Sequence, residues 1–183
     1  MKWNYFLFAL LTISFISCDP DDPEDVNEEE LITTVTYTLS PTSGGSDVVL
    51  SFQDLDGDGG NDAIIVGGTL ASNTTYNGSL TLLNESEDPV EDITEEVQEE
   101  DDEHQFFFQV DNLDLAVQYA DQDGDGNPIG LLSTVTTRGA GNGSLTVILK
   151  HEPEKDAAGV SSGDITNAGG ETDISVTFPV TIQ

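Results

Sequence analysis

The chain has 183 residues and carries 36 acidic side chains against 4 basic ones, which gives a formal net charge of −32. Repulsion of this size disfavours nucleic acid and anionic lipid surfaces as partners. The length suits one domain with a sizeable core, and the single cysteine excludes an internal disulfide. Bound cations are therefore the simplest means of relieving the repulsion.

The first 17 residues have the layout of a secretory signal peptide. Lys2 precedes an apolar-rich stretch over residues 5–16, and Cys18 follows it after the small residue Ser17. The stretch is shorter than the roughly 20 residues that a membrane-spanning helix needs. A cysteine at this place is where a bacterial lipoprotein is cleaved and acylated, although Phe15 stands where leucine is commoner. We expect residues 1–17 to be a signal peptide and Cys18 to be lipidated.

An acidic tether is predicted over residues 18–30. Eight of the twelve residues 19–30 are acidic, and such a segment stays extended because its charges repel and it has little apolar surface to bury. The acidic start resembles a signal that exports lipoproteins to the cell surface. In other Gram-negative groups, an aspartate directly after the lipidated cysteine, as at Asp19, resembles a signal that retains lipoproteins in the inner membrane. We expect an extracytoplasmic outer-membrane lipoprotein, with the cell surface favoured over the periplasmic face.

Residues 31–183 are predicted to form a single β-domain. Short runs with β-branched and alternating apolar residues are separated by Gly, Asn and Asp clusters, which indicates an antiparallel β-sandwich of immunoglobulin-like type. The expected strands are 31–39, 47–52, 63–66, 78–83, 104–110, 113–119, 131–137, 143–150 and 173–182. One short acidic helix is expected over 89–100, with Val90, Ile93 and Val97 on one face.

An internal repeat divides this domain into two strand–Asp-loop–strand units. Residues 48–59 match 115–126 at an offset of 67, and 77–81 match 142–146 at an offset of 65. The second match contains Asn-Gly and is interpreted as a turn. Ordered matches at nearly equal offsets favour a duplication over chance recurrence of turn residues.

The Asp-rich loops are candidate calcium sites. Asp at alternate positions before a glycine is how a loop wraps carboxylate oxygens around Ca²⁺, although neither loop has the bidentate Glu or flanking helices of an EF-hand. A plain hairpin turn is the alternative. The expected ligands are Asp54, Asp56, Asp58 and Asp62 with Asn61 in the first loop, and Asp121, Asp123, Asp125 and Asn127 in the second.

The two histidines suggest a second metal site. His104 follows an acid-rich run and His151 ends a predicted strand, and two imidazoles with a carboxylate can hold Zn²⁺ or Cu²⁺. The candidate ligands are His104, His151, Glu103 and Glu152. The interpretation that the sequence favours, however, is two exposed histidines at strand ends, and the acid run is more simply a solvated face.

Five segments of the chain carry a resemblance to known proteins: the acidic tether and residues 28–32, 102–106, 150–153 and 163–173. Together they resemble a family of small Bacteroidota-type lipoproteins that carry the label of the type 1 periplasmic binding fold. The resemblance implies a non-enzymatic accessory lipoprotein, associated with an outer-membrane uptake receptor. The labelled fold is a two-lobed α/β structure, whereas the strand pattern of this chain has no βαβ alternation and predicts a sandwich.

Three classes of function follow from these patterns. The leading one is a lipid-anchored, Ca²⁺-stabilised binding or adhesion module with no catalytic residues. The alternative is a lipoprotein that captures Zn²⁺ or Cu²⁺ through His104 and His151. A secreted hydrolase is a distant third, because the sequence has no nucleophile elbow, phosphate-binding loop or closely spaced His-acid metal motif.

Overall fold

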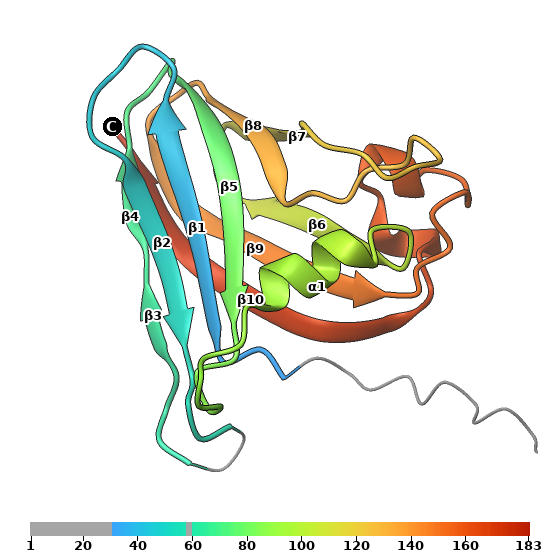
Figure 1. The fold of residues 1–183 in the computed structure, drawn as a ribbon. Helices are drawn as coiled ribbons and strands as arrows, with labels where there is room; N and C mark the ends of the chain where they lie inside the picture. Colours follow the sequence, from blue (N-terminus) through green and yellow to red (C-terminus); the bar gives the residue numbers. More distant parts are fainter. Residues whose placement is uncertain (1–30, 58–59) are drawn as a thin grey trace, which may run out of the picture.

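The structure is a computed structural model that describes residues 31–57 and 60–183, and its strands form two sheets (Figure 1). The larger sheet has the order β3-β2-β1-β5-β8-β7 and the smaller one β4-β10-β9-β6. The strands of the larger sheet are β1 (Thr34–Pro41), β2 (Val48–Gln53), β3 (Ile64–Val66), β5 (Thr75–Leu83), β7 (Leu115–Tyr119) and β8 (Leu132–Thr137). Those of the smaller sheet are β4 (Gly68–Leu70), β6 (His104–Asp111), β9 (Gly141–His151) and β10 (Glu171–Ile182).

The predicted all-β sandwich is confirmed, with one departure from a fully antiparallel arrangement. β4, which the sequence pattern did not predict, runs parallel to β10. The chain enters β4 from β3 through Gly67, and so passes between edge strands of different sheets. A side chain at Gly67 would overlap the carbonyl oxygen of Pro179, which explains why glycine stands at this crossing.

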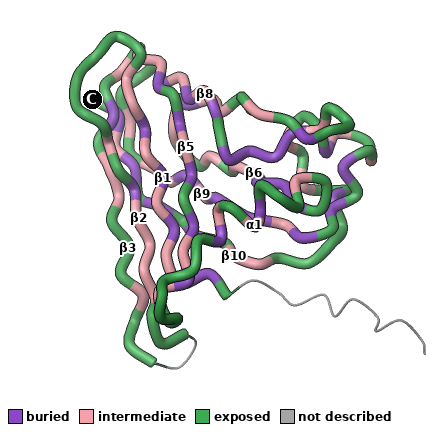
Figure 2. Tube along the Cα trace, in the orientation of Figure 1, coloured by how far each residue is buried: buried purple, intermediate pink, exposed green. Residues whose placement is uncertain are grey.

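A single apolar core lies between the two sheets (Figure 2). Strand alternation creates it: Val35, Tyr37 and Leu39 are buried on β1, whereas their neighbours along the strand are only partly buried. Phe106 and Phe178 contribute from the smaller sheet. Tyr37 keeps a polar contact inside the core, because its hydroxyl lies 2.6 Å from Ser133 Oγ. Burial raises the pKa of the Tyr37 phenol far above its usual range, against the smaller opposing effect of that hydrogen bond.

The predicted acidic helix is present but shorter than expected. α1 spans Ile93–Glu99 and leads from β5 in one sheet to β6 in the other. Ile93 and Val97 are buried as predicted, whereas Val90 is 52% exposed and lies before the helix. The helix begins late because the Asp92 carboxylate caps it by accepting from the amide of Thr94 at 3.0 Å.

The two strand–Asp-loop–strand units exist as the hairpins β2–β3 and β7–β8, at opposite ends of the larger sheet. The repeat does not extend further. Asn77-Gly78 lies inside β5 and Asn142-Gly143 inside β9, so both predicted Asn-Gly turns are wrong, and the two strands belong to different sheets.

A segment between β9 and β10 covers the outer face of the smaller sheet. It contains two single-turn 3₁₀ helices, η1 (Val160–Ser162) and η2 (Ile165–Asn167). Val160 and Ala168 pack there against Phe107 and Ile148, which form a second, smaller apolar cluster. This covering segment also carries Lys155, which is buried.

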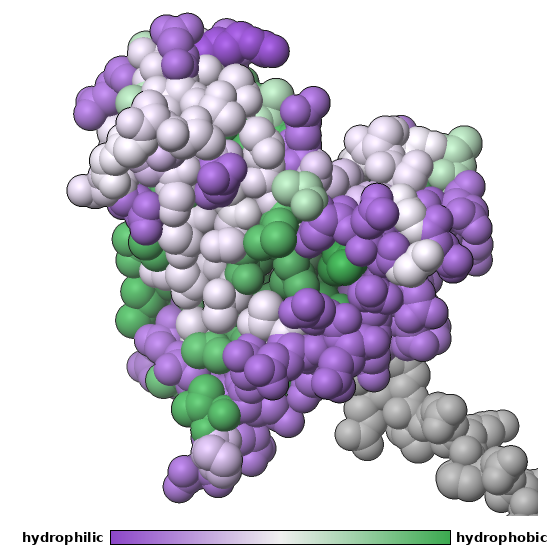
Figure 3. All heavy atoms as spheres, turned by 45° about the horizontal axis from the view of Figure 1, so that its top comes forward, coloured by the Kyte–Doolittle hydropathy of each residue, from purple (hydrophilic) through white to green (hydrophobic). Residues whose placement is uncertain are grey.

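Hydrophilic side chains dominate much of the surface in Figure 3, with apolar groups gathered in limited areas. Within the described residues, no helix has the length and apolar character needed to cross a bilayer. The predicted signal peptide, the predicted lipidation site at Cys18 and the predicted tether over 18–30 lie outside the described residues, as does Asp58 of the first loop.

Candidate metal centre

Strand register brings the two histidines together. His104 is the first residue of β6 and is paired directly with His151, the last residue of β9. Both lie on the inward-facing positions of their strands, in phase with Phe106 and Leu149. The interpretation as exposed strand-end histidines is therefore wrong: both are buried, and their ring centroids are 4.6 Å apart.

A backbone contact fixes the tautomer of His104. Its Nδ1 lies 3.2 Å from the carbonyl oxygen of Glu100, just past the end of α1. A carbonyl can only accept, so Nδ1 carries the proton and the lone pair of the neutral ring is on Nε2. Metal-binding histidines commonly have this arrangement, in which one nitrogen donates to the backbone and the other is the ligand.

Asp173 is a third member of the cluster that the sequence analysis missed. The pairing of β10 with β9 shifts between Thr172 and Ile174, so Asp173 is the extra residue of a β-bulge. Its carboxylate is fully buried, and Oδ1 lies 4.0 Å from His151 Nδ1. His104, His151 and Asp173 each offer one ligand atom within 4.8 Å of the others, and we call them the inner set.

The predicted ligands Glu103 and Glu152 lie on the outer side of His151. Glu103 Oε2 is 3.6 Å from His151 Nε2 and its side chain is 51% exposed. The amide of Glu152 donates to the carbonyl of Glu103 at 2.7 Å, which holds the two residues side by side. Glu103, His151 and Glu152 also offer ligand atoms within 4.8 Å of one another, and we call them the outer set.

Glu103 and Glu152 of the outer set also line an acidic pocket of about 420 Å³. Seven carboxylates and one ammonium line it, together with Asn127 and Pro153. The charged residues are Asp102, Glu103, Asp123, Asp125, Glu152, Glu154, Lys155 and Asp156. This excess of negative charge favours small cations at the mouth of the site.

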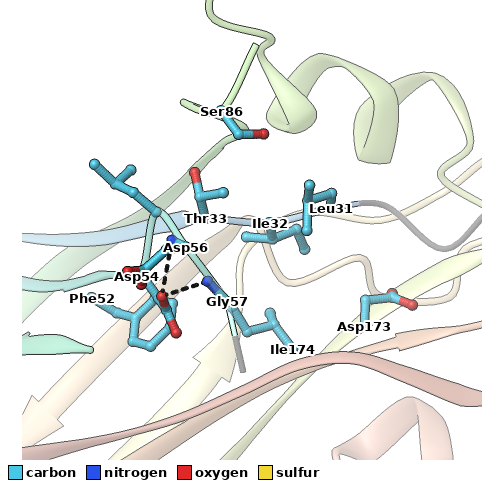
Figure 4. Close-up of a pocket in the computed structure, with 11 residues that line it drawn as sticks. Leu31, Ile32, Thr33, Phe52, Asp54, Asp56, Gly57, Ser86, Asp173 and Ile174 are labelled. Atoms are coloured by element: carbon cyan, nitrogen blue, oxygen red, sulfur yellow. Dashed lines mark hydrogen bonds between the residues drawn. The ribbon is translucent and has the colours of Figure 1, made fainter. Parts of the chain in front are cut away.

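In the first Asp loop, the carboxylates of Asp54 and Asp56 accept hydrogen bonds from amides of the same loop. Asp54 accepts from the amides of Asp56 and Gly57 at 3.3 and 2.9 Å, beside a pocket of about 400 Å³ (Figure 4). Asp56 accepts from the backbone and side-chain amides of Asn61, and these bonds hold the pKa of Asp56 below its usual value. Asp62 is exposed.

In the second Asp loop, an ammonium group pairs with the central carboxylate. Asp123 Oδ2 accepts from Lys155 Nζ at 2.9 Å, and Oδ1 accepts from the amides of Asp125 and Asn127. Burial alone would raise the pKa of Asp123, but the hydrogen bonds from Lys155 and the amides outweigh it and lower the pKa. Asp121 turns both oxygens to the amides of Gly130 and Leu132, each at 2.7 Å.

The structure therefore gathers the predicted histidine ligands more closely than the predicted calcium ligands. Among residues 31–57 and 60–183, the groups of three or more potential metal ligands are the inner and outer sets, and neither contains a residue of the Asp loops. Calcium binding by the loops stays a prediction. Comparisons with known protein families, with curated proteins and with solved structures found no match.

Proposed function

We propose that this protein is a lipid-anchored, extracytoplasmic, non-enzymatic lipoprotein that binds Zn²⁺ or Cu²⁺ at His104, His151 and Asp173. The observation that carries the proposal is the buried juxtaposition of two imidazoles and one carboxylate from three adjacent strands. The same proposal includes a lipid anchor at Cys18. It also includes association with an outer-membrane uptake receptor, which the family resemblance implies.

The spacing of the inner set suits a transition metal. Ligands about 2.1 Å from a tetrahedral Zn²⁺ lie roughly 3.4 Å from one another. The ligand atoms of the inner set lie within 4.8 Å of one another, so shifts of about 1 Å would bring them into coordination. Three protein ligands leave a fourth position open, which is how an ion remains exchangeable.

The nature of the ligands favours a transition metal over calcium. Imidazole nitrogen suits Zn²⁺ and Cu²⁺, whereas Ca²⁺ requires six to eight oxygen ligands. Asp173 adds one buried carboxylate oxygen, which Zn²⁺ accepts as a ligand beside two imidazoles.

Equilibrium metal binding tests the proposal. The purified chain is stripped of metal, and its uptake of Zn²⁺ and Cu²⁺ is measured by competition with a chromogenic chelator. We expect one equivalent to bind tightly, and H104A or D173N to weaken binding at least about tenfold. The matched control is D111N, which removes a carboxylate from the exposed Asp111 at the opposite end of β6 from His104 and should leave the affinity unchanged.

Two results would contradict the proposal: an affinity in H104A equal to that of the unaltered chain, or Ca²⁺ as the sole ion bound stoichiometrically. Elemental analysis of the protein from its native host provides an independent check. Zinc or copper near one equivalent supports metal capture, whereas calcium alone would restore the Ca²⁺-stabilised module as the better account.

A further inference from the structure

Resting on the proposed function, we infer that the outer set is a second, transient cation position that receives the ion from solution and passes it to the inner set through His151. The geometry of His151 points to this role. Its Nε2 faces the exposed Glu103 carboxylate at 3.6 Å, and its Nδ1 faces the buried Asp173 carboxylate at 4.0 Å. One imidazole thus belongs to both groups of ligands.

The two positions are alternatives and do not fill together. A neutral imidazole carries a lone pair on only one of its nitrogens, so an ion bound through one nitrogen leaves the other protonated. An ion at the outer position uses Nε2, and an ion at the inner position uses Nδ1. Transfer inward therefore breaks the metal–Nε2 bond and forms a metal–Nδ1 bond. The proton released from Nδ1 goes to solvent water and Nε2 takes up a proton from solvent, so the neutral ring carries one proton before and after the transfer.

Exposure and charge set the direction of transfer. Glu103 is about half exposed and Glu152 is exposed, so the outer position stays hydrated and holds an ion weakly. The pocket of about 420 Å³ that Glu103 and Glu152 line has seven carboxylates against the single ammonium of Lys155, and this excess of negative charge raises the local cation concentration. The inner position is buried and adds a second imidazole, that of His104. Because imidazole nitrogen suits Zn²⁺ and Cu²⁺, the ion should bind more tightly at the inner position than as a hydrated ion at the outer one.

Glu152, which directly follows His151, has a left-handed backbone conformation. Its φ is +47°, in the left-handed region that residues other than glycine rarely adopt. The same residue donates its amide to the carbonyl of Glu103 at 2.7 Å. That bond and the left-handed turn follow directly after His151, and Glu103, His151 and Glu152 each offer one ligand atom within 4.8 Å of the others.

Separate measurements of rate and affinity test the relay. Zn²⁺ is delivered from a chromogenic chelator in a stopped-flow instrument, and uptake is compared with the equilibrium affinity. For E103Q/E152Q we expect uptake to slow about tenfold or more, because steering of this kind accounts for factors of 10 to 1,000, while the affinity changes less than about threefold. The control E95Q/E99Q removes the same charge from exposed positions of α1 and should bind at the unaltered rate.

The H104A variant separates the two positions. It should lose tight binding but retain a fast, weak phase, because the outer set does not include His104. Equal uptake rates in E103Q/E152Q and E95Q/E99Q, or loss of the fast phase in H104A, would overturn the relay and leave the inner site standing. If the unaltered chain takes up no Zn²⁺ or Cu²⁺, the proposed function itself fails.

Discussion

Substitution of Lys155 by methionine should destabilise the domain, because it leaves the Asp123 carboxylate without its ammonium partner. The Lys155 and Asp123 side chains are 6% and 1% exposed, and their charged atoms lie 2.9 Å apart. Lys155 Nζ also donates to the carbonyl of Asp101, which links the covering segment to the turn after α1. A methionine side chain keeps most of the apolar stem and removes only the charge and these bonds.

The expected loss is about 2–3 kcal/mol of unfolding free energy. Removal of one partner from a fully buried ion pair costs about 3–5 kcal/mol. The cost here should be lower because Asp123 keeps two amide hydrogen bonds and lines an open pocket. With a urea m-value of about 2 kcal/mol/M, the unfolding midpoint should fall by about 1 to 1.5 M.

Equilibrium urea unfolding provides the assay, with K150M as the matched control. Lys150 donates to the carbonyl of Gly170 and to Thr172 Oγ1 at the surface, so its removal should cost less than about 0.5 kcal/mol. Equal midpoints for K155M and K150M, or a K155M midpoint equal to that of the unaltered chain, would refute the reasoning.

Acid and calcium should also separate K155M from the unaltered chain. The lowered pKa of Asp123 contributes stability that is present above its ordinary value of 3.8 and is lost as pH falls through the folded-state pKa. K155M should lose much of this acid dependence. Removal of the Lys155 ammonium also leaves the Asp123 carboxylate available to a cation. In K155M, therefore, Ca²⁺ bound by the second loop should raise the urea unfolding midpoint more than NaCl does at matched ionic strength.

Three further predictions concern other parts of the chain. C18S should leave the protein unprocessed or in the soluble fraction, and unchanged membrane fractionation would contradict the lipid anchor. D92A should cost about 1 kcal/mol in urea unfolding through loss of the α1 cap, whereas D92N should cost much less, and equal effects would argue against capping. G143A should cost about 1–3 kcal/mol, because a Cβ there would overlap the carbonyl oxygen of Asp111, whereas G141A, with its nearest neighbour at 3.7 Å, should be close to neutral.

The strands could be predicted because burial alternates along them. On β10, Val176, Phe178, Val180 and Ile182 are buried while the residues between them are not, and that period of two is visible in the sequence. β4 was missed because three residues are too few to show a period. Its pairing with β10 depends on the chain crossing between sheets at Gly67, which is a tertiary feature.

The two Asn-Gly pairs were misinterpreted because glycine serves a different purpose there. A side chain at Gly78 would collide with Ser133 and Tyr37, and one at Gly143 would collide with the backbone at Asp111. Both glycines therefore allow close approach of neighbouring groups within a sheet or core, and neither supplies the positive φ of a turn. Local sequence cannot distinguish these two uses of glycine.

The candidate site was partly predictable. His104 and His151 stand in phase with buried Phe106 and Leu149, so strand alternation alone could have placed both rings inward. Asp173 gave no such signal, because a bulge changes the side on which a residue lies without leaving a mark in the sequence. Lys155 was equally hidden, since its buried ammonium contacts Asp123 and Asp101, which are distant from it in the sequence.

The crossing at Gly67 has a consequence for how the domain opens. β3 is hydrogen-bonded to the larger sheet and β4 to the smaller one, with a single residue between them. Separation of β3 from β2 would therefore also displace β4 from β10, and the reverse. Amide hydrogen exchange at the two edges should therefore proceed through one shared opening event, with similar protection on both sides, and proteases should cleave this edge only at the rate set by that event.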